Sequence, residues 1–146
     1  MYRTILVPTD GSAGSELAVE HALDLAARYD ATLHLLYVVD TDVVNHYAGI
    51  DAIEGVEGAL ETQGADALEA AAARASDERV TAERHVVEGR PHEAILDAVS
   101  MVGADLVVMG TERKSGEYRR LLGSVTERVV RMTDVPVHVV KAKADA

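Results

Sequence analysis

The stretch Leu106-Val107-Val108-Met109-Gly110, followed after a polar loop by Gly123-Ser124-Val125-Thr126-Glu127, says most about the fold of this chain. The first part is an apolar run ending in glycine, which predicts a buried strand, and the second opens an amphipathic helix. The first N–H groups of a helix are free, and its positive dipole end favours an anion. Strand, loop and helix in this order therefore predict an anion site, and phosphate is the anion we expect.

Basic residues concentrate in the same part of a strongly acidic chain. The formal net charge is −11 over 146 residues, yet six of the 14 basic residues lie between positions 113 and 131. Such a local excess favours a bound phosphate. Arg128 and Arg131 come late in the predicted helix and could instead complement its negative dipole end, which leaves Arg113 and Lys114 as the better candidates. Arg119 and Arg120 complete the group.

Composition narrows the class of protein. The length fits one domain, residues 1–146, that buries roughly two-thirds of its unfolded surface. Cys, Trp and Phe are missing, which excludes disulfides and thiol chemistry and leaves Val, Leu, Ile and Ala for the core. We expect a cytoplasmic protein with no membrane partner, because we find no targeting segment and no apolar run of roughly 20 residues. The acidity argues against nucleic acid, and the three Lys fit either an ordinary cytosolic protein or one from a salt-loving organism.

Apolar runs and amphipathic segments alternate along the chain. This alternation predicts an α/β fold, a single doubly wound domain whose five-stranded parallel sheet carries helices on both faces. The third run mixes polar and apolar residues and belongs at an edge, and with the first and fourth strands as neighbours the order is 3-2-1-4-5. The expected strands are Thr4–Pro8, Leu33–Val39, 80–87, Leu106–Met109 and Val137–Val140.

Four helices are expected between these strands. Ser12 is the expected N-cap of the first, and Pro91 fits the first turn of the third, which Gly103 ends. Four glycines between residues 41 and 64 each lower helix propensity by about 1 kcal/mol, so we expect a mobile loop there and a helix only from about Ala65 to Ala75. The last helix should run from Ser124 to Met132. The buried positions expected are Ala18, Ala22, Leu25, Ala26 and Tyr29, then Ala94, Ile95, Ala98 and Val99, and finally Val125, Val129 and Met132.

A crevice is expected where the loops after the first and fourth strands diverge to opposite faces of the sheet. Asp10 and Gly110 would both lie on its rim. Each also has a simpler explanation, since an Asp that closes a strand often forms a turn. Ser124 with Glu127 forms a capping box, which would engage the Ser124 hydroxyl with or without a ligand.

These residues resemble the universal stress protein family over nearly the whole chain. The resemblance is carried by Ile5–Ser12, Leu35–Asp40 and Gly110–Lys141. Members that bind ATP are similar in having a Gly, two residues, a second Gly, nine residues, then Gly and Ser or Thr. In this phosphate loop, about residues 110–124, Gly110, Gly123 and Ser124 match, but Arg113 replaces the second glycine. Arginine there either blocks the pocket or donates to phosphate oxygens, and Gly116 restores some flexibility.

The resemblance implies a role for each matching position. Adenine would lie near Pro8 and Val38, Asp10 would bind the ribose hydroxyls, and Gly110 would lie beside the sugar. Gly123, Ser124 and Val125 would contact the phosphates. The other expected site residues are Thr9, Met109, Arg113 and Gly116. The expected ligand is ATP or a related adenine nucleotide, with or without magnesium.

The leading hypothesis is a stress-response regulatory module that binds the nucleotide and responds by ordering the loop from Thr111 to Leu122. The resemblance also implies a homodimer, for which the terminal strand Val137–Val140 offers an edge. One alternative is a dimerisation module of the same fold that no longer binds nucleotide, supported by Arg113. The other is a weak ATPase, at most slow, because nothing supplies a nucleophile or base, and the six scattered histidines lack metal-ligand spacing.

Overall fold

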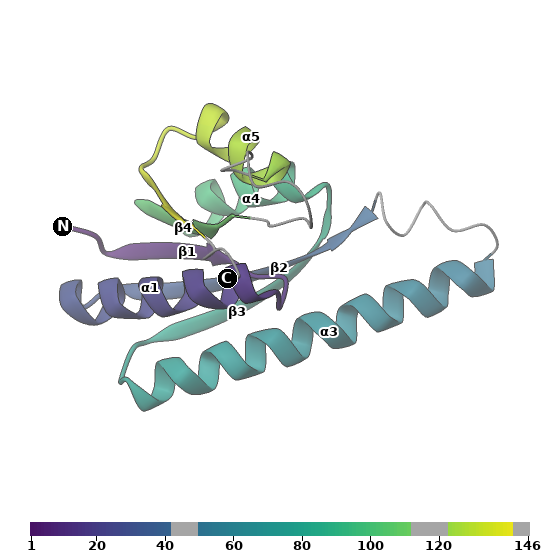
Figure 1. Cartoon of the computed structure of the whole chain (residues 1–146), viewed down its shortest axis with the longest axis horizontal. Helices are drawn as coiled ribbons and strands as arrows, with labels where there is room; N and C mark the ends of the chain where they lie inside the picture. The colour runs from purple at the N-terminus through teal and green to yellow at the C-terminus, as the bar shows by residue number, and fades with distance from the viewer. Residues whose placement is uncertain (42–49, 112–122, 142–146) are drawn as a thin grey trace, which may run out of the picture.

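We describe the protein from a computed structural model, which defines residues 1–41, 50–111 and 123–141 (Figure 1). Strands and helices alternate, as predicted. The elements are β1 (Thr4–Pro8), α1 (Ala13–Tyr29), β2 (Thr32–Asp40), α3 (Ile50–Asp77), β3 (Ala82–Gly89), α4 (Pro91–Val102), β4 (Leu106–Gly110), α5 (Ser124–Met132) and β5 (Val137–Val140).

The five strands form one parallel sheet in the order β3-β2-β1-β4-β5, which confirms the predicted order. The half-polar β3 lies at an edge, while β1, whose central residues are fully buried, lies in the middle. A parallel sheet covered on both faces needs apolar residues on both faces of its inner strands. The apolar sequences of β1, β2 and β4 meet that need.

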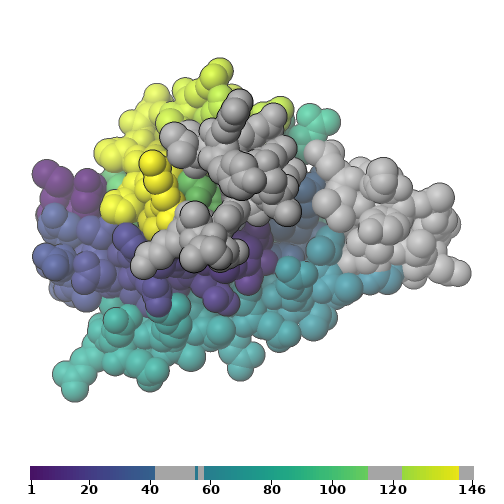
Figure 2. Space-filling model, in the orientation of Figure 1, coloured from purple at the N-terminus to yellow at the C-terminus, as the bar shows by residue number. Residues whose placement is uncertain are grey.

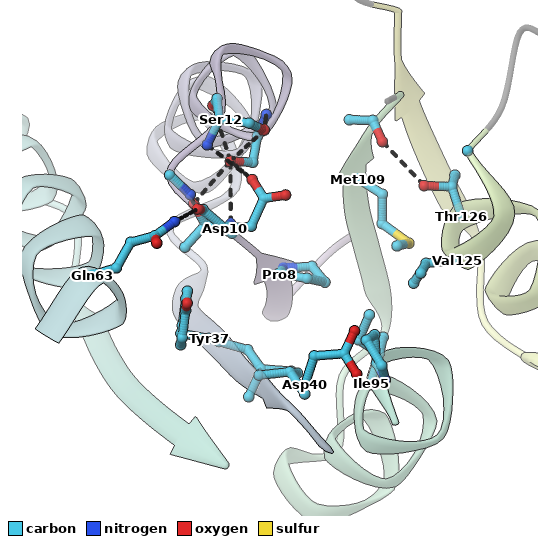
Figure 3. Close-up of a pocket in the computed structure, with 18 of the residues that line it drawn as sticks. Pro8, Asp10, Ser12, Tyr37, Asp40, Gln63, Ile95, Met109, Val125 and Thr126 are labelled. Carbon is cyan, nitrogen blue, oxygen red and sulfur yellow. Dashed lines mark hydrogen bonds between the residues drawn. The ribbon is translucent and has the colours of Figure 1, made fainter. Parts of the chain in front are cut away.

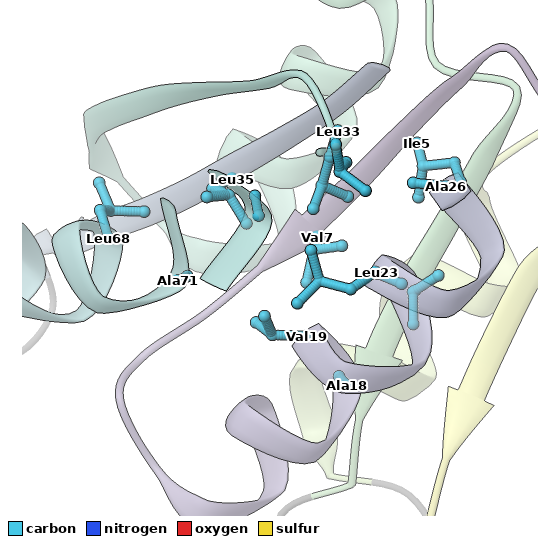
Figure 4. Close-up of a cluster of buried hydrophobic side chains, with 14 of the residues drawn as sticks. Ile5, Val7, Ala18, Val19, Leu23, Ala26, Leu33, Leu35, Leu68 and Ala71 are labelled. Atoms are coloured by element: carbon cyan, nitrogen blue, oxygen red, sulfur yellow. The ribbon is translucent and has the colours of Figure 1, made fainter. Parts of the chain in front are cut away.

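The side chains of each strand divide between two cores. On one face, Ile5 and Val7 pack with α1 and α3 (Figure 4). On the other, Leu6 packs with residues of α4 and α5, including Ile95 and Val129. In the space-filling view α1 and α3 lie side by side along one face of the molecule (Figure 2). In the described part of the chain, no helix combines the length and the apolar character that crossing a bilayer requires.

Helix α1 begins where predicted. The Ser12 hydroxyl accepts a hydrogen bond from the Ser15 N–H, at 3.3 Å, as an N-cap does. The expected inner position of Tyr29 is wrong, because that side chain is 42% exposed and packs edge-on against Tyr2. The buried stripe instead passes through Val19 and Leu23 (Figure 4).

Helix α3 begins at Ile50, so the prediction of a loop as far as Gly64 is wrong from residue 50 onward. Two of the glycines that suggested a loop, Gly55 and Gly58, have nothing within 4 Å of where a Cβ would stand. Their cost is therefore conformational, about 1 kcal/mol each, and a long Ala- and Glu-rich helix tolerates it. The expected loop residues 42–49 lie outside the described ranges, and their mobility stays a prediction.

Helix α5 has the predicted bounds but not the predicted cap. Gly123 is the N-cap and Ser124 the first helical residue, so the capping box is wrong. Glu127 instead pairs with Arg131 one turn later, at 2.7 Å. The buried residues are Thr126 and Val129, whereas Met132, expected inside, is 60% exposed. Helix α4 follows its prediction, with Pro91 in the first turn and Gly103 as a left-handed C-cap.

Candidate functional site

A pocket of about 490 Å³ opens at the carboxyl ends of β1, β2 and β4 (Figure 3). This is where α/β sheets of this type bind ligands, and the volume lies in the usual range of small-molecule sites. Eight of the eleven residues expected at the site line the pocket: Pro8, Thr9, Asp10, Val38, Met109, Gly110, Gly123 and Val125.

Of the other three expected residues, one is described by the structure and two are not. Ser124 is exposed and is not part of the pocket lining, although both its neighbours in sequence are. Arg113 and Gly116 lie outside the described residues. Whether Arg113 blocks or assists a phosphate therefore stays a prediction.

The polar edge of the pocket is built around Asp10. Its Oδ1 accepts hydrogen bonds from the Ser12 N–H and from the Ser15 hydroxyl, each at 2.9 Å. Ser15 also lies 3.1 Å from the Thr9 hydroxyl. Burial alone would raise the pKa of the Asp10 carboxyl, but hydrogen bonds from Ser12 and Ser15 outweigh it, so the pKa lies below its ordinary value. Asp10 is thus held ionised, in one orientation.

The opposite part of the pocket is apolar. Pro8 and Val38 come from β1 and β2, Ile95 from α4 and Val125 from α5 (Figure 3). Met109, at the end of β4, is buried between them. Such a lining suits a flat, largely apolar group, whose polar atoms would meet the backbone at the strand ends.

The first turn of α5 supplies the third component, an anion site. Its first intrahelical bond runs from the Glu127 N–H to the Gly123 carbonyl, at 2.9 Å. The N–H groups of residues 124–126 precede that bond and are unpaired within the helix. The Thr126 hydroxyl donates to the Gly110 carbonyl, at 3.0 Å, which fixes the helix start to the end of β4 (Figure 3). The site can therefore hold an apolar ring, hydroxyl groups and an anion in adjacent places.

Gly110 has a packing role of its own. A Cβ at this position would collide with the Gly14 carbonyl, and a Cβ at Gly14 would stand 2.6 Å from the Thr111 carbonyl. The first turn of α1 and the end of β4 are thus in direct backbone contact. This contact explains Gly110 without a ligand, while its position still leaves it in the pocket wall.

Helix α3 forms a wall that the sequence analysis missed. The Gln63 side-chain amide donates to the Asp10 carbonyl, at 3.1 Å, and Leu60 lies one turn earlier on the pocket side (Figure 3). Tyr37 of β2 and Asp40 at its end also line the pocket. The i, i+3 spacing of Leu60 and Gln63 was the available signal, but it lies in the segment assigned to a loop.

The histidines form two contacts away from this pocket. His34 Nδ1 lies 2.9 Å from His85 Nε2, and His21 Nδ1 lies 3.4 Å from His138 Nε2. In the residues that the structure describes, no group of three His, Asp or Glu side chains is arranged to hold a metal ion.

Comparison with known proteins finds many curated proteins and solved structures that are similar to this chain. The sequence profile of the universal stress protein family matches residues 1–141. Universal stress protein MJ0531 of Methanocaldococcus jannaschii is 39% identical, over 97% of this chain and 83% of that protein. The solved structure of MJ0577 from the same organism is 30% identical with a TM-score of 0.86, covering 99% of each chain. A universal stress protein in complex with cAMP is 30% identical with a TM-score of 0.70, covering 96% of this chain and 97% of that one.

Proposed function

The chain belongs to the universal stress protein family, and from that premise we propose that it binds ATP or a related adenine nucleotide in the pocket beside Asp10. We propose further that it acts in the cytoplasm as a stress-responsive regulatory module. The observation that carries the proposal is the adjacency of an apolar slot, an ionised carboxylate and a free helix N-terminus. These three parts match the chemistry of the base, the ribose and the phosphates of a nucleotide, and all three belong to one pocket.

Each part of the nucleotide would meet a different element. The adenine would lie against Pro8 and Val38, the ribose hydroxyls would donate to Asp10, and the phosphates would accept from the N–H groups at the start of α5. The structural neighbour in complex with cAMP supports an adenine nucleotide as the ligand class. The proposed response, ordering of the loop between β4 and α5, falls on residues outside the described ranges.

Isothermal titration tests this proposal. Purified protein is titrated with ATP, ADP, AMP and cAMP, with and without magnesium, and thermal stabilisation is followed in parallel. We expect saturable binding of at least one of them, weakened at least tenfold by Asp10→Ala. Asp24→Ala is the matched control, because Asp24 is an exposed carboxylate on α1 that does not line the pocket and pairs with Arg28. Absence of both heat and stabilisation with all four nucleotides would favour the dimerisation module.

The Arg113→Gly variant tests what the arginine does at the position where the family pattern has its second glycine. Tighter ATP binding by the variant would mean that the arginine obstructs the pocket. Weaker binding would mean that it donates to phosphate. The ATPase alternative predicts phosphate release that an Asp10→Ala variant abolishes.

A further inference from the structure

Tyr37 combines near-complete burial with a hydroxyl that has no hydrogen-bond partner among residues 1–41, 50–111 and 123–141. The residue is 3% exposed and lines the pocket, and its hydroxyl makes no hydrogen bond with any residue that the structure describes. In the same described part, every fully buried side-chain polar atom has a partner. The Tyr37 hydroxyl must therefore be open to the pocket. Figure 3 shows it pointing toward Gln63 and the Asp10 loop.

The ring of Tyr37 is held firmly in place. Helix α3 passes so close that a Cβ on Gly64 would collide with Cδ1, Cε1 and Cγ of the ring. Gly64 thus allows α3 to pack directly on the Tyr37 ring, which belongs to the larger core. A hydroxyl on a ring fixed in this way is a preorganised hydrogen-bonding group, which loses little entropy when a ligand binds.

We propose that Tyr37 contacts the ligand directly and, together with Asp10, recognises a hydroxyl of the ribose. This inference rests on the proposed function and adds a residue that the family pattern did not suggest. A carboxylate only accepts hydrogen bonds, whereas a sugar hydroxyl donates one and accepts others. The Asp10 carboxylate would accept the hydrogen bond that the sugar hydroxyl donates. The Tyr37 hydroxyl would donate a hydrogen bond to the oxygen of the same sugar hydroxyl.

The charge around Tyr37 favours a neutral partner over a phosphate. Burial raises the pKa of the Tyr37 phenol, and the negative charge of Asp10 raises it further, so the hydroxyl remains protonated at neutral pH. The same carboxylate would repel a phosphate placed beside it. Asp10 Oδ1 is already occupied by Ser12 and Ser15, which leaves Oδ2 as the acceptor for the sugar.

The test compares ATP, 2′-deoxy-ATP and 3′-deoxy-ATP on the wild type and on Tyr37→Phe. The variant keeps the ring and its packing on Gly64, so its melting temperature should stay close to that of the wild type. We expect Tyr37→Phe to weaken ATP binding by roughly 3- to 10-fold, the size of one neutral hydrogen bond. The loss should fall below about 2-fold with the deoxy analogue that lacks the contacted hydroxyl. Tyr29→Phe is the control, since Tyr29 lies on α1 against Tyr2.

The outcomes separate this inference from the proposed function. If the wild type binds ATP and Tyr37→Phe binds it equally well, the Tyr37 contact is wrong while nucleotide binding stands. An equal loss with ATP and with both deoxy analogues would show that the hydroxyl does not read the ribose, and would overturn the inference in that form. A wild type that binds none of the three overturns the inference and the ATP assignment together.

Discussion

Ser15 organises the polar edge of the pocket. Its hydroxyl lies within hydrogen-bonding distance of the Thr9 hydroxyl, the Asp10 backbone and carboxylate, and the Ser12 carbonyl. All four partners belong to the turn that connects β1 to α1. A single hydroxyl therefore fixes the turn and the orientation of Asp10 at once, and the Ser12 cap places that hydroxyl in the first turn of α1.

The depressed pKa of Asp10 makes a prediction about acid stability. A carboxylate whose pKa is lower in the folded state stabilises that state above its unfolded pKa and ceases to do so as the pH falls through the folded value. We expect the free energy of unfolding of the wild type to exceed that of Asp10→Asn by a constant amount near neutral pH. The difference should shrink below about pH 4, measured by urea unfolding from pH 7 to pH 2.5.

The control for this prediction is Asp24→Asn, on the exposed face of α1. It reports the effect of removing one carboxylate far from the turn. A difference between wild type and Asp10→Asn that grows as the pH falls would contradict the hydrogen-bond account of Asp10.

Helix α3 contains glycines whose effects on the stability of the protein are opposite. Gly58 faces open space, whereas Gly64 packs on the Tyr37 ring. The first costs helix stability, and the second permits the contact that brings α3 to the pocket. Gln63, beside Gly64, then reaches the Asp10 carbonyl.

We predict effects of opposite sign for alanine at these two positions. Gly58→Ala should raise the free energy of unfolding by about 0.5–1 kcal/mol, because alanine loses less backbone entropy in a helix. Gly64→Ala should lower it by about 1–3 kcal/mol, because the added methyl overpacks against the ring. Chemical denaturation of the two variants measures both. Stabilisation by Gly64→Ala would mean that α3 does not press on Tyr37.

The pairing of β2 with β3 contains a second pH-sensitive element. Burial lowers the pKa of His34, Glu83 opposes that shift and His85 adds to it, and the net pKa is below its ordinary value. The His34 ring stacks on that of His85, while its Nε2 lies 3.5 Å from a Glu83 oxygen. All three side chains project from one face of the paired strands.

Protonation of His34 lowers the free energy of unfolding, whereas protonation of a histidine whose pKa is raised by an acidic partner increases it. A base with a depressed folded pKa favours folding while it is neutral, so its contribution is present above about pH 6.5 and is lost as the pH falls below that value. We expect His34→Gln to flatten the decline of unfolding free energy below pH 6.5. His21→Gln, on the opposite face of the sheet, should keep the wild-type slope. A wild-type stability that rises below pH 6.5 would contradict this assignment.

At the scale of the whole molecule, β5 presents one edge of the sheet. The Pro136 carbonyl accepts a hydrogen bond from the Val107 N–H of β4, and the Val140 carbonyl accepts one from the Thr111 N–H just after β4. The backbone groups of residues 137 and 139 therefore point the other way. Those outward groups could pair with a second copy of β5, as the proposed homodimer requires.

Replacing an outward N–H tests that dimer without breaking the sheet. Val139→Pro removes a donor that β4 does not use, and proline is tolerated at such edge positions. We expect sedimentation velocity to show a dimer for the wild type and a monomer for Val139→Pro. Val86→Thr, on the exposed part of the opposite edge strand β3, should remain dimeric. A dimer that survives Val139→Pro would have to use another surface.

The architecture of the chain follows from its residue pattern. The family resemblance is what placed Pro8 and Gly123 at the site. Strand and helix alternation, the central place of β1, the edge place of β3 and the position of Asp10 and Gly110 on one crevice could be predicted from the residues themselves. These features follow from local hydrophobic periodicity and from the rule that parallel strands present their carboxyl ends at one edge. Such patterns depend on residues that are close together in the sequence.

The tertiary structure alone decided which elements close the pocket. The backbone contact of Gly110 with Gly14, the capping of α5 by Gly123 and the exposure of the Tyr37 hydroxyl had no local signature, and the start of α3 had only the weak one of the Leu60 and Gln63 spacing. The Asp10–Gln63 hydrogen bond joins residues 53 positions apart, and it exists because Gly64 lets a helix pack on an aromatic ring. Contacts of this kind depend on where two distant segments meet, and the folded sheet is what brings them together.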